Sequence, residues 1–301
     1  MEKINKDLKT KNFSISDKAY SDLSNHLSNS RKAYKVDIPN FYYFKKFEEY
    51  LYDHKKRRDP FEEINRFKNY DASNLLGDFD TSNYLENFRA NVIDSLDLRF
   101  QNLKGCNHLR SSKLYKNKLK TKKLIESLID PIEKKISNIL DSKFIITKIE
   151  EVVTLKGKDD HAHFWHFDPV PLGYGKVFFY FSSSEETDGK TKFISPMDSF
   201  KLLQKGYNNI PLSKRSKNLQ DFSEAQEIRI GDKGKYMIFL SGMMLHRGSY
   251  PTFGKRKIIS INFLRSNHYW KDVFDELWSI DKLSGKWIPS NWPQHNIKID
   301  L

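Results

Sequence analysis

The stretch that decides the fold of this chain is HAHFWHFDPVP, residues 161–171, followed closely by KVFFYF, residues 176–181. In an extended strand successive side chains alternate between the two faces, so His166 and Asp168 point the same way, about 7 Å apart. Phe167 then faces the opposite side. One strand can therefore present an imidazole and a carboxylate together, which is how a strand supplies two metal ligands.

A second segment, further along the chain, has the pattern of strand, turn and strand around another histidine. It consists of KYMIFL (235–240), SGMMLHRGS (241–249) with His246, a turn at 251–254, and RKIISINF (256–263). Two histidines and one carboxylate leave positions open on a bound ion. This donor set is typical of non-haem Fe(II) oxygenases rather than of closed structural zinc sites.

The length of 301 residues allows a sizeable core, and a barrel or sandwich of this size is commonly one domain. We expect a single domain, 1–301, with a mainly helical N-terminal part (1–142), a β core (143–265) and an aromatic-rich tail (266–301). The hydrophobic fraction is only 38%, but 14% of the residues are aromatic, and each ring buries a large area. Disorder throughout the chain is not expected.

Four stretches of the N-terminal part have apolar residues at helical spacing, and each predicts a helix. They begin near Ser14, Phe41, Asp80 and Leu119, and the last contains Pro131, which should kink or break the helix. Helices of this kind suit the outer face of a sheet.

From residue 143 the pattern changes to that of short strands rich in β-branched and aromatic residues. Four strands are expected, at 144–155, 161–168, 176–181 and 190–194. Short strands separated by turns indicate an antiparallel sandwich or barrel. A short helix at 197–205 and a polar loop at 208–224 should interrupt the strands.

Charge and cysteine content bound the cellular setting. The net charge is +13, with lysines densest at 113–123, and such a surface attracts anions such as nucleic acid or acidic substrates. The same lysines can equally be a solvated surface, so nucleic acid is an open but not the preferred partner. Cys106 is the single cysteine, which excludes an internal disulfide. With no apolar run of roughly 18 residues and no signal-peptide core, we expect a cytoplasmic protein without a membrane span.

Three motifs occur in order within the β core: His166-Phe-Asp168, then DGKTKFISP at 188–196, then HRGS at 246–249, with Arg256 ten positions after the histidine. This ordered set resembles the phytanoyl-CoA dioxygenase family of Fe(II)/2-oxoglutarate-dependent oxygenases. The resemblance covers roughly residues 150–265, and the helical first half carries no matching motif.

The resemblance implies a double-stranded β-helix, a jelly-roll barrel of the cupin kind, with the helical half packed on its outer sheet. It implies that three residues hold Fe(II): His166, Asp168 and His246. It also implies that Arg256 pairs with the distal carboxylate of 2-oxoglutarate, and Ser249 and Thr191 are candidates to assist that carboxylate.

The residues themselves agree with the role implied for Arg256. A guanidinium is always charged and grips a carboxylate through two parallel hydrogen bonds. On the last strand, strict alternation puts Arg256, Ile258, Ser260 and Asn262 on one face, so this partly polar face should line the cavity.

The implied reaction is the hydroxylation of a small-molecule substrate by O2, with 2-oxoglutarate as cosubstrate and with release of succinate and CO2. Related halogenases have a small residue where Asp168 stands, so the carboxylate favours hydroxylation or another oxidative step such as desaturation. Substrate identity and oligomeric state have no signal in the sequence.

Three alternatives stay open at this point. The same chemistry could act on RNA or protein bound by the basic surface. The chain could be a non-catalytic binding protein on a degenerate barrel. A zinc hydrolase could use the same three ligands, although Arg256 would then have no role.

Two further features are a second pair of histidines and a cluster of tryptophans near the end of the sequence. His161 and His163 lack the strand parity of His166, and we interpret them as surface or supporting residues rather than ligands. Four of the five tryptophans lie in the last 32 residues, at 270, 278, 287 and 292, which predicts that this tail packs back onto the barrel.

Overall fold

The computed structural model describes residues 66–82, 108–111, 118–157, 163–168, 173–204 and 227–275. The helices expected near Ser14 and Phe41, most of the one from Asp80, the loop at 208–224 and His161 lie outside these residues. So do Trp278, Trp287 and Trp292.

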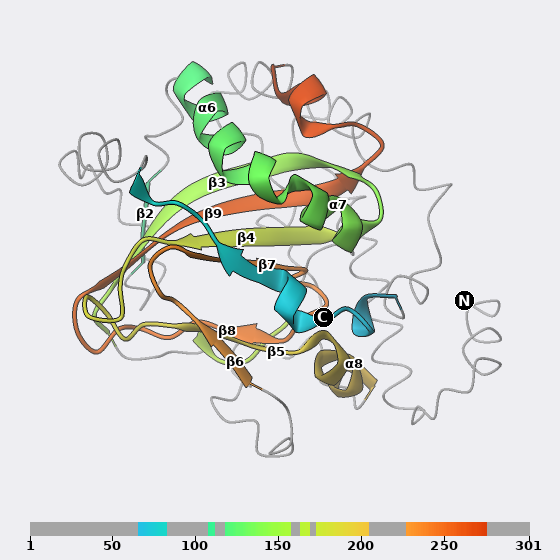
Figure 1. Cartoon of the computed structure of the whole chain (residues 1–301). Coiled ribbons are helices and arrows are strands. Elements are labelled where there is room, and N and C mark those ends of the chain that lie inside the picture. Colours follow the sequence, from blue (N-terminus) through green and yellow to red (C-terminus); the bar gives the residue numbers. More distant parts are fainter. Residues whose placement is uncertain are drawn as a thin grey trace, which may run out of the picture.

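Two antiparallel sheets form the body of the described chain (Figure 1). The larger has six strands in the order β1 (Leu76–Asp78), β7 (Lys235–Phe239), β4 (Tyr174–Tyr180), β9 (Lys255–Ser266), β3 (Lys143–Leu155) and β2 (His108–Ser111). The smaller has three, in the order β6 (Glu227–Ile230), β5 (Thr191–Ile194) and β8 (His246–Arg247). The expected antiparallel arrangement is therefore confirmed, and five of the expected strands appear as β3, β4, β5, β7 and β9.

The two sheets lie one above the other and share one hydrophobic core (Figure 1). Phe193 and Ile230 of the small sheet belong to the same buried cluster as Val177 and Phe239 of the large one. A polar contact also joins the sheets, because the hydroxyl of Tyr180 donates to Thr191 Oγ1 at 2.8 Å.

Strand β9 is buried along most of its length because both of its faces are covered. The helices α6 (Lys118–Ile129) and α7 (Glu133–Leu140) lie over the outer face of the large sheet (Figure 1). On the inner face the register places Ile258 opposite Tyr180 and Asn262 opposite Lys176. Opposed residues of an antiparallel pair share a face, so the inner face mixes aromatic and polar side chains.

The predicted interruption at Pro131 is a break. Helix α6 ends at Ile129, a 3-10 turn covers Asp130–Ile132, and α7 follows directly. A second 3-10 turn lies at Ala72–Leu75, and the helix expected at 197–205 is α8 (Pro196–Gln204). At the end of α7 the buried Arg265 of β9 donates to the carbonyl of Leu140, which places a positive charge at the negative end of the helix. None of the helices in the described ranges is long and apolar enough to span a membrane.

The strand expected at 161–168 differs most from expectation. Within its described part, 163–168, the chain bends, and only His166 forms a bridge, to His246 of β8. A proline follows Asp168 and cannot donate to a ladder, so a long strand is disfavoured here. Strands β1, β2 and β6, of three or four residues each, were not anticipated.

The start of the C-terminal tail packs as expected. Trp270 is 1% exposed and makes an edge contact with Phe274, at 6.1 Å between ring centroids. Both belong to the common core.

The turn before β9 provides a test of the fold. Gly254 has φ +66°, and a Cβ placed on it would collide with the backbone carbonyl of Glu186. Gly234 has φ +80°, but its nearest neighbour would be Phe79 O at 3.5 Å. We expect Gly254→Ala to lower the free energy of unfolding by roughly 2–5 kcal/mol, against about 1–2 kcal/mol for Gly234→Ala. Urea denaturation measures both, and equal losses would contradict the packing described here.

Candidate metal centre

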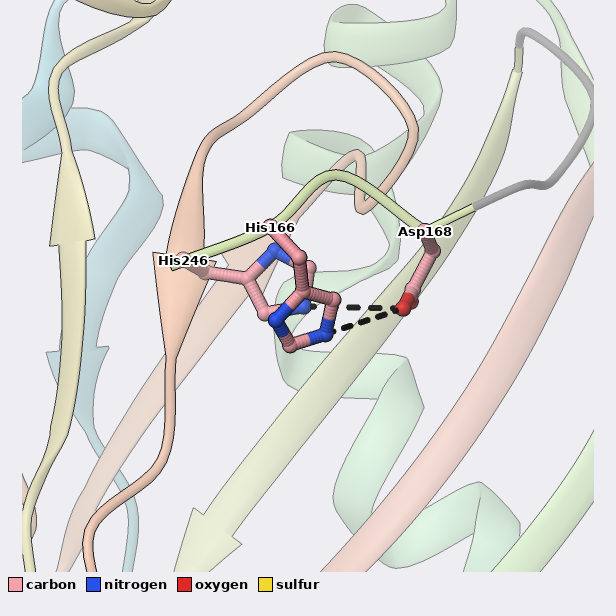
Figure 2. A group of neighbouring side chains, drawn as sticks. All are labelled: His166, Asp168 and His246. Carbon is pink, nitrogen blue, oxygen red and sulfur yellow. Dashed lines mark ion pairs between the residues drawn. The ribbon is translucent and has the colours of Figure 1, made fainter. Parts of the chain in front are cut away.

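Three side chains that are far apart in sequence meet between the two sheets: His166, Asp168 and His246. Asp168 Oδ1 lies 3.5 Å from His166 Nε2 and 3.7 Å from His246 Nε2. Figure 2 shows both imidazole rings turned toward this carboxylate. All three potential ligand atoms lie within 4.8 Å of one another.

The backbone creates this meeting point. His166 N donates to His246 O at 3.0 Å, and His246 N donates to His166 O at 3.1 Å. Asp168 N donates to Ser241 O at 2.9 Å, which anchors the acid two residues further on. The segment carrying the first two residues is thus tied directly to the segment carrying the third.

Helix α8 helps to fix the start of strand β8, which carries His246. The fully buried hydroxyl of Ser199 donates to Ile194 O at 3.1 Å and accepts from Leu245 N at 3.0 Å. One side chain therefore fixes the residue just before His246 against the end of β5.

Backbone carbonyls set the protonation of both rings. Nδ1 of His166 is 2.7 Å from Phe164 O, and Nδ1 of His246 is 2.9 Å from Met244 O. A carbonyl only accepts, so each Nδ1 carries a proton, and Nε2 is the ring atom that each histidine can offer to a metal ion. The rings are therefore oriented as metal ligands, with both Nε2 atoms toward Asp168.

The electrostatics of the site keep His246 neutral and Asp168 charged. Burial, assisted by the neighbouring His166, lowers the pKa of His246 to about 3. Burial also raises the pKa of Asp168, but the Lys176 ammonium and the two histidines outweigh it, and that pKa lies well below its usual range. Neutral imidazole and ionised carboxylate are the forms that bind a metal ion.

The donor set fits a divalent transition metal. Ligands at about 2.1 Å and right angles to one another are about 3 Å apart, so donors 3.5 and 3.7 Å apart need only a small contraction. Two nitrogens and one oxygen on one side leave the other positions of a six-coordinate ion open. This is the arrangement of the 2-His-1-carboxylate triad.

Lys176 was missed by the sequence interpretation. Its Nζ lies 2.5 Å from Asp168 Oδ2, the oxygen that does not face the histidines. A signal existed, since Lys176 is the one charged residue of KVFFYF and shares a strand face with Phe178 and Tyr180.

Arg256 is buried, at 5% exposure, and donates through Nη2 to Thr154 Oγ1 at 3.1 Å. It lies beside the residues that follow His246, because a Cβ on Gly248 would be 3.8 Å from Arg256 Nη2. Its charge also reaches Tyr180. Burial raises the pKa of that phenol to about 12, while the Thr191 hydrogen bond and the Arg256 charge act to lower it.

The other residues predicted to assist occupy different surroundings. Thr191 is 3% exposed and accepts a hydrogen bond from the hydroxyl of Tyr180, whose pKa the Arg256 charge acts to lower. Ser249 Oγ donates to Lys190 O at 2.7 Å and accepts from Lys190 N at 3.1 Å, so it ties the loop after β8 to the start of β5. His163 is buried, with its ring centroid 3.9 Å from that of Tyr250, and it is not part of the three-residue group.

No family model and no curated protein matches the chain in sequence. Solved structures do align with it. The non-haem α-ketoglutarate-dependent epimerase SnoN from nogalamycin biosynthesis has 12% identity over 69% of this chain and 84% of its own, with a TM-score of 0.42. HygX from Streptomyces hygroscopicus, solved with nickel, 2-oxoglutarate and hygromycin B, has 13% identity over 65% and 84%, with a TM-score of 0.40. A Pseudomonas putida prolyl-4-hydroxylase has 12% identity over 60% and 83%, with a TM-score of 0.37.

The low pKa of His246 gives a prediction for the metal-free protein. The unfolded chain binds a proton at this histidine near pH 6.5, whereas the folded chain excludes it down to about pH 3. The unfolded state therefore takes up more protons in this window, and stability falls as the pH is lowered through it. In chelator-treated protein, the stability of His246→Gln should therefore fall less steeply with decreasing pH than that of wild type. The difference in slope should be up to about 1.4 kcal/mol per pH unit.

Chemical denaturation at several pH values from about 3.5 to about 6.5 measures how the free energy of unfolding changes with pH. The exposed His268 provides the control, because His268→Gln should retain the wild-type slope. Identical slopes for wild type and His246→Gln would show that the buried ring is not neutral.

Proposed function

We propose that this chain is an Fe(II)- and 2-oxoglutarate-dependent oxygenase that hydroxylates a small-molecule substrate. The observation that carries the proposal is the open triad of His166, Asp168 and His246, with a buried arginine on the same side of the large sheet. We further propose that the two sheets form one double-stranded β-helix domain. The order β7-β4-β9-β3 in one sheet and β6-β5-β8 with the His166 bridge in the other support that topology.

In this proposal the triad holds Fe(II) through His166 Nε2, His246 Nε2 and Asp168 Oδ1. Fe(II) held there would supply, together with 2-oxoglutarate and O2, the oxidising chemistry that hydroxylates a C–H bond, with succinate and CO2 as the other products. The chain's own contribution is orientation. Carbonyls fix both rings, and the sheet core excludes water from the side of the buried His246.

Arg256 is proposed to bind the distal carboxylate of 2-oxoglutarate. A guanidinium at 5% exposure is a strong attractor for an anion, because water screens its charge poorly. Thr191 and Tyr180 add hydroxyls beside it. Ser249 enters the proposal indirectly, by holding the start of β5, and with it Thr191, in place.

The basic run at 113–123 gives limited support to the alternative of a macromolecular substrate. Only its C-terminal part lies in the described residues, and there Lys118 and Lys122 form ion pairs with Asp275 at 3.0 and 3.6 Å. These two lysines thus join α6 to the chain after β9. A small-molecule substrate stays the preferred proposal, tested by succinate release with Fe(II), ascorbate and 2-oxoglutarate against a metabolite panel.

The metal assignment predicts that the purified chain binds one Fe(II) and that His166→Ala or His246→Ala removes it, because two remaining ligands hold a labile divalent ion weakly. Iron content after anaerobic reconstitution is the measurement. His163→Phe, a change at a nearby buried histidine outside the triad, should keep the iron. Wild-type iron content in either alanine variant would refute the assignment.

The cosubstrate assignment predicts that Arg256→Leu raises the KM for 2-oxoglutarate while iron binding is retained. Loss of a charged partner from a buried carboxylate costs about 2–5 kcal/mol, which is roughly a 30- to 4000-fold weaker interaction. Lys257→Leu, on the opposite face of β9, is the matched control and should leave the KM near wild type. An unchanged KM in Arg256→Leu would move the role to another cation.

A further inference from the structure

The two oxygens of the Asp168 carboxylate have different neighbours, because Lys176 is bound to only one of them. Oδ1 faces the two Nε2 atoms at 3.5 and 3.7 Å, whereas Oδ2 lies 2.5 Å from Lys176 Nζ. The ammonium is therefore bound to one oxygen of the carboxylate, and the two histidines lie against the other. An ion placed among the three donors would meet Oδ1 without displacing the lysine.

The position of Lys176 is itself fixed. It lies in the middle of the large sheet on β4, paired with Phe239 of β7 on one side and Asn262 of β9 on the other. Its side chain is 22% exposed and that of Asp168 is 15% exposed, so the charge-assisted hydrogen bond is partly shielded from water. A rigid strand thus sets the direction of the carboxylate.

The ion pair with Lys176 affects how Asp168 would bind a metal, because a carboxylate can coordinate through one oxygen or through both. On a six-coordinate ion, two imidazoles and one carboxylate oxygen leave three positions, and a second carboxylate oxygen would occupy one of them. A cosubstrate that chelates with two atoms and O2 with one need all three.

We propose that Lys176 is a positioning residue that holds Asp168 in the one-oxygen mode and so keeps the third position of the metal open. This inference rests on the metal site of the proposed function, but it concerns the geometry of the ion and not the identity of the substrate. A purely structural ion pair would stabilise the fold and leave the coordination of the metal unchanged.

Mn(II) bound to the full-length protein separates these roles, since the relaxation of water protons reports how many waters the ion carries. We expect three waters for wild type and two for Lys176→Met, a fall of about one third in the inner-sphere relaxation. Lys176→Arg keeps the charge and should keep three. Lys192→Met is the matched control, because Lys192 has similar exposure, 24%, and pairs with Glu227 at 3.1 Å on the other sheet.

A second variant protects the test if Lys176→Met folds poorly. Lys176→Ala should also lose one water, and added propylammonium should restore it, because the site of the lost ammonium is partly open to solvent. Three waters in both Lys176→Met and Lys176→Ala, or no Mn(II) binding by wild type, would overturn the proposal. The expected water counts without any succinate release would instead leave it standing and contradict the oxygenase function.

Discussion

The site depends on one pair of backbone hydrogen bonds, between His166 and His246. Their amides and carbonyls exchange both bonds, at 3.0 and 3.1 Å, although the residues are 80 positions apart in sequence. In such a pair the side chains emerge on the same side of the ladder. The ring centroids accordingly lie 4.5 Å apart, and the carboxylate of Asp168 completes the group only because its segment is held by this bridge and by Ser241.

A concentration of charge in a largely apolar interior costs free energy unless charges are paired. Asp168 meets this condition in the metal-free state, since the Lys176 ammonium compensates its desolvation. His246 meets it differently, by remaining neutral. Asp168 and His246 are thus kept in metal-binding form, the first by one lysine and the second by burial. A single substitution can alter either contribution.

The sequence grouped His166, Asp168 and His246, which the structure brings together, but it predicted the local structure around them less well. His166 and Asp168 were paired by the parity of a strand, yet within 163–168 only His166 is bridged, and the two side chains converge because of tertiary hydrogen bonds. Patterns of β-branched residues located β3, β4 and β9, which are long enough to show a period. Strands β1, β2 and β6 are too short for one, and their pairing is decided by neighbours remote in sequence. The pairing of Lys176 with Asp168 has no sequence signal of its own, because it depends on how the 163–168 segment packs against β4.

The side chains around the His166, Asp168 and His246 group differ in their exposure to solvent. His246, on β8, has 8% of its side chain exposed, whereas His166 and Asp168 have 14% and 15%, and Lys176 has 22%. The open side is therefore the one formed by the 163–168 segment and β4, and the closed side is formed by β8 with Phe239, whose ring lies 5.1 Å from that of His246. Arg256 lies toward the closed side, next to Gly248. Under the proposed function, a 2-oxoglutarate anchored at Arg256 would occupy the interior, and we propose that the substrate approaches past Lys176.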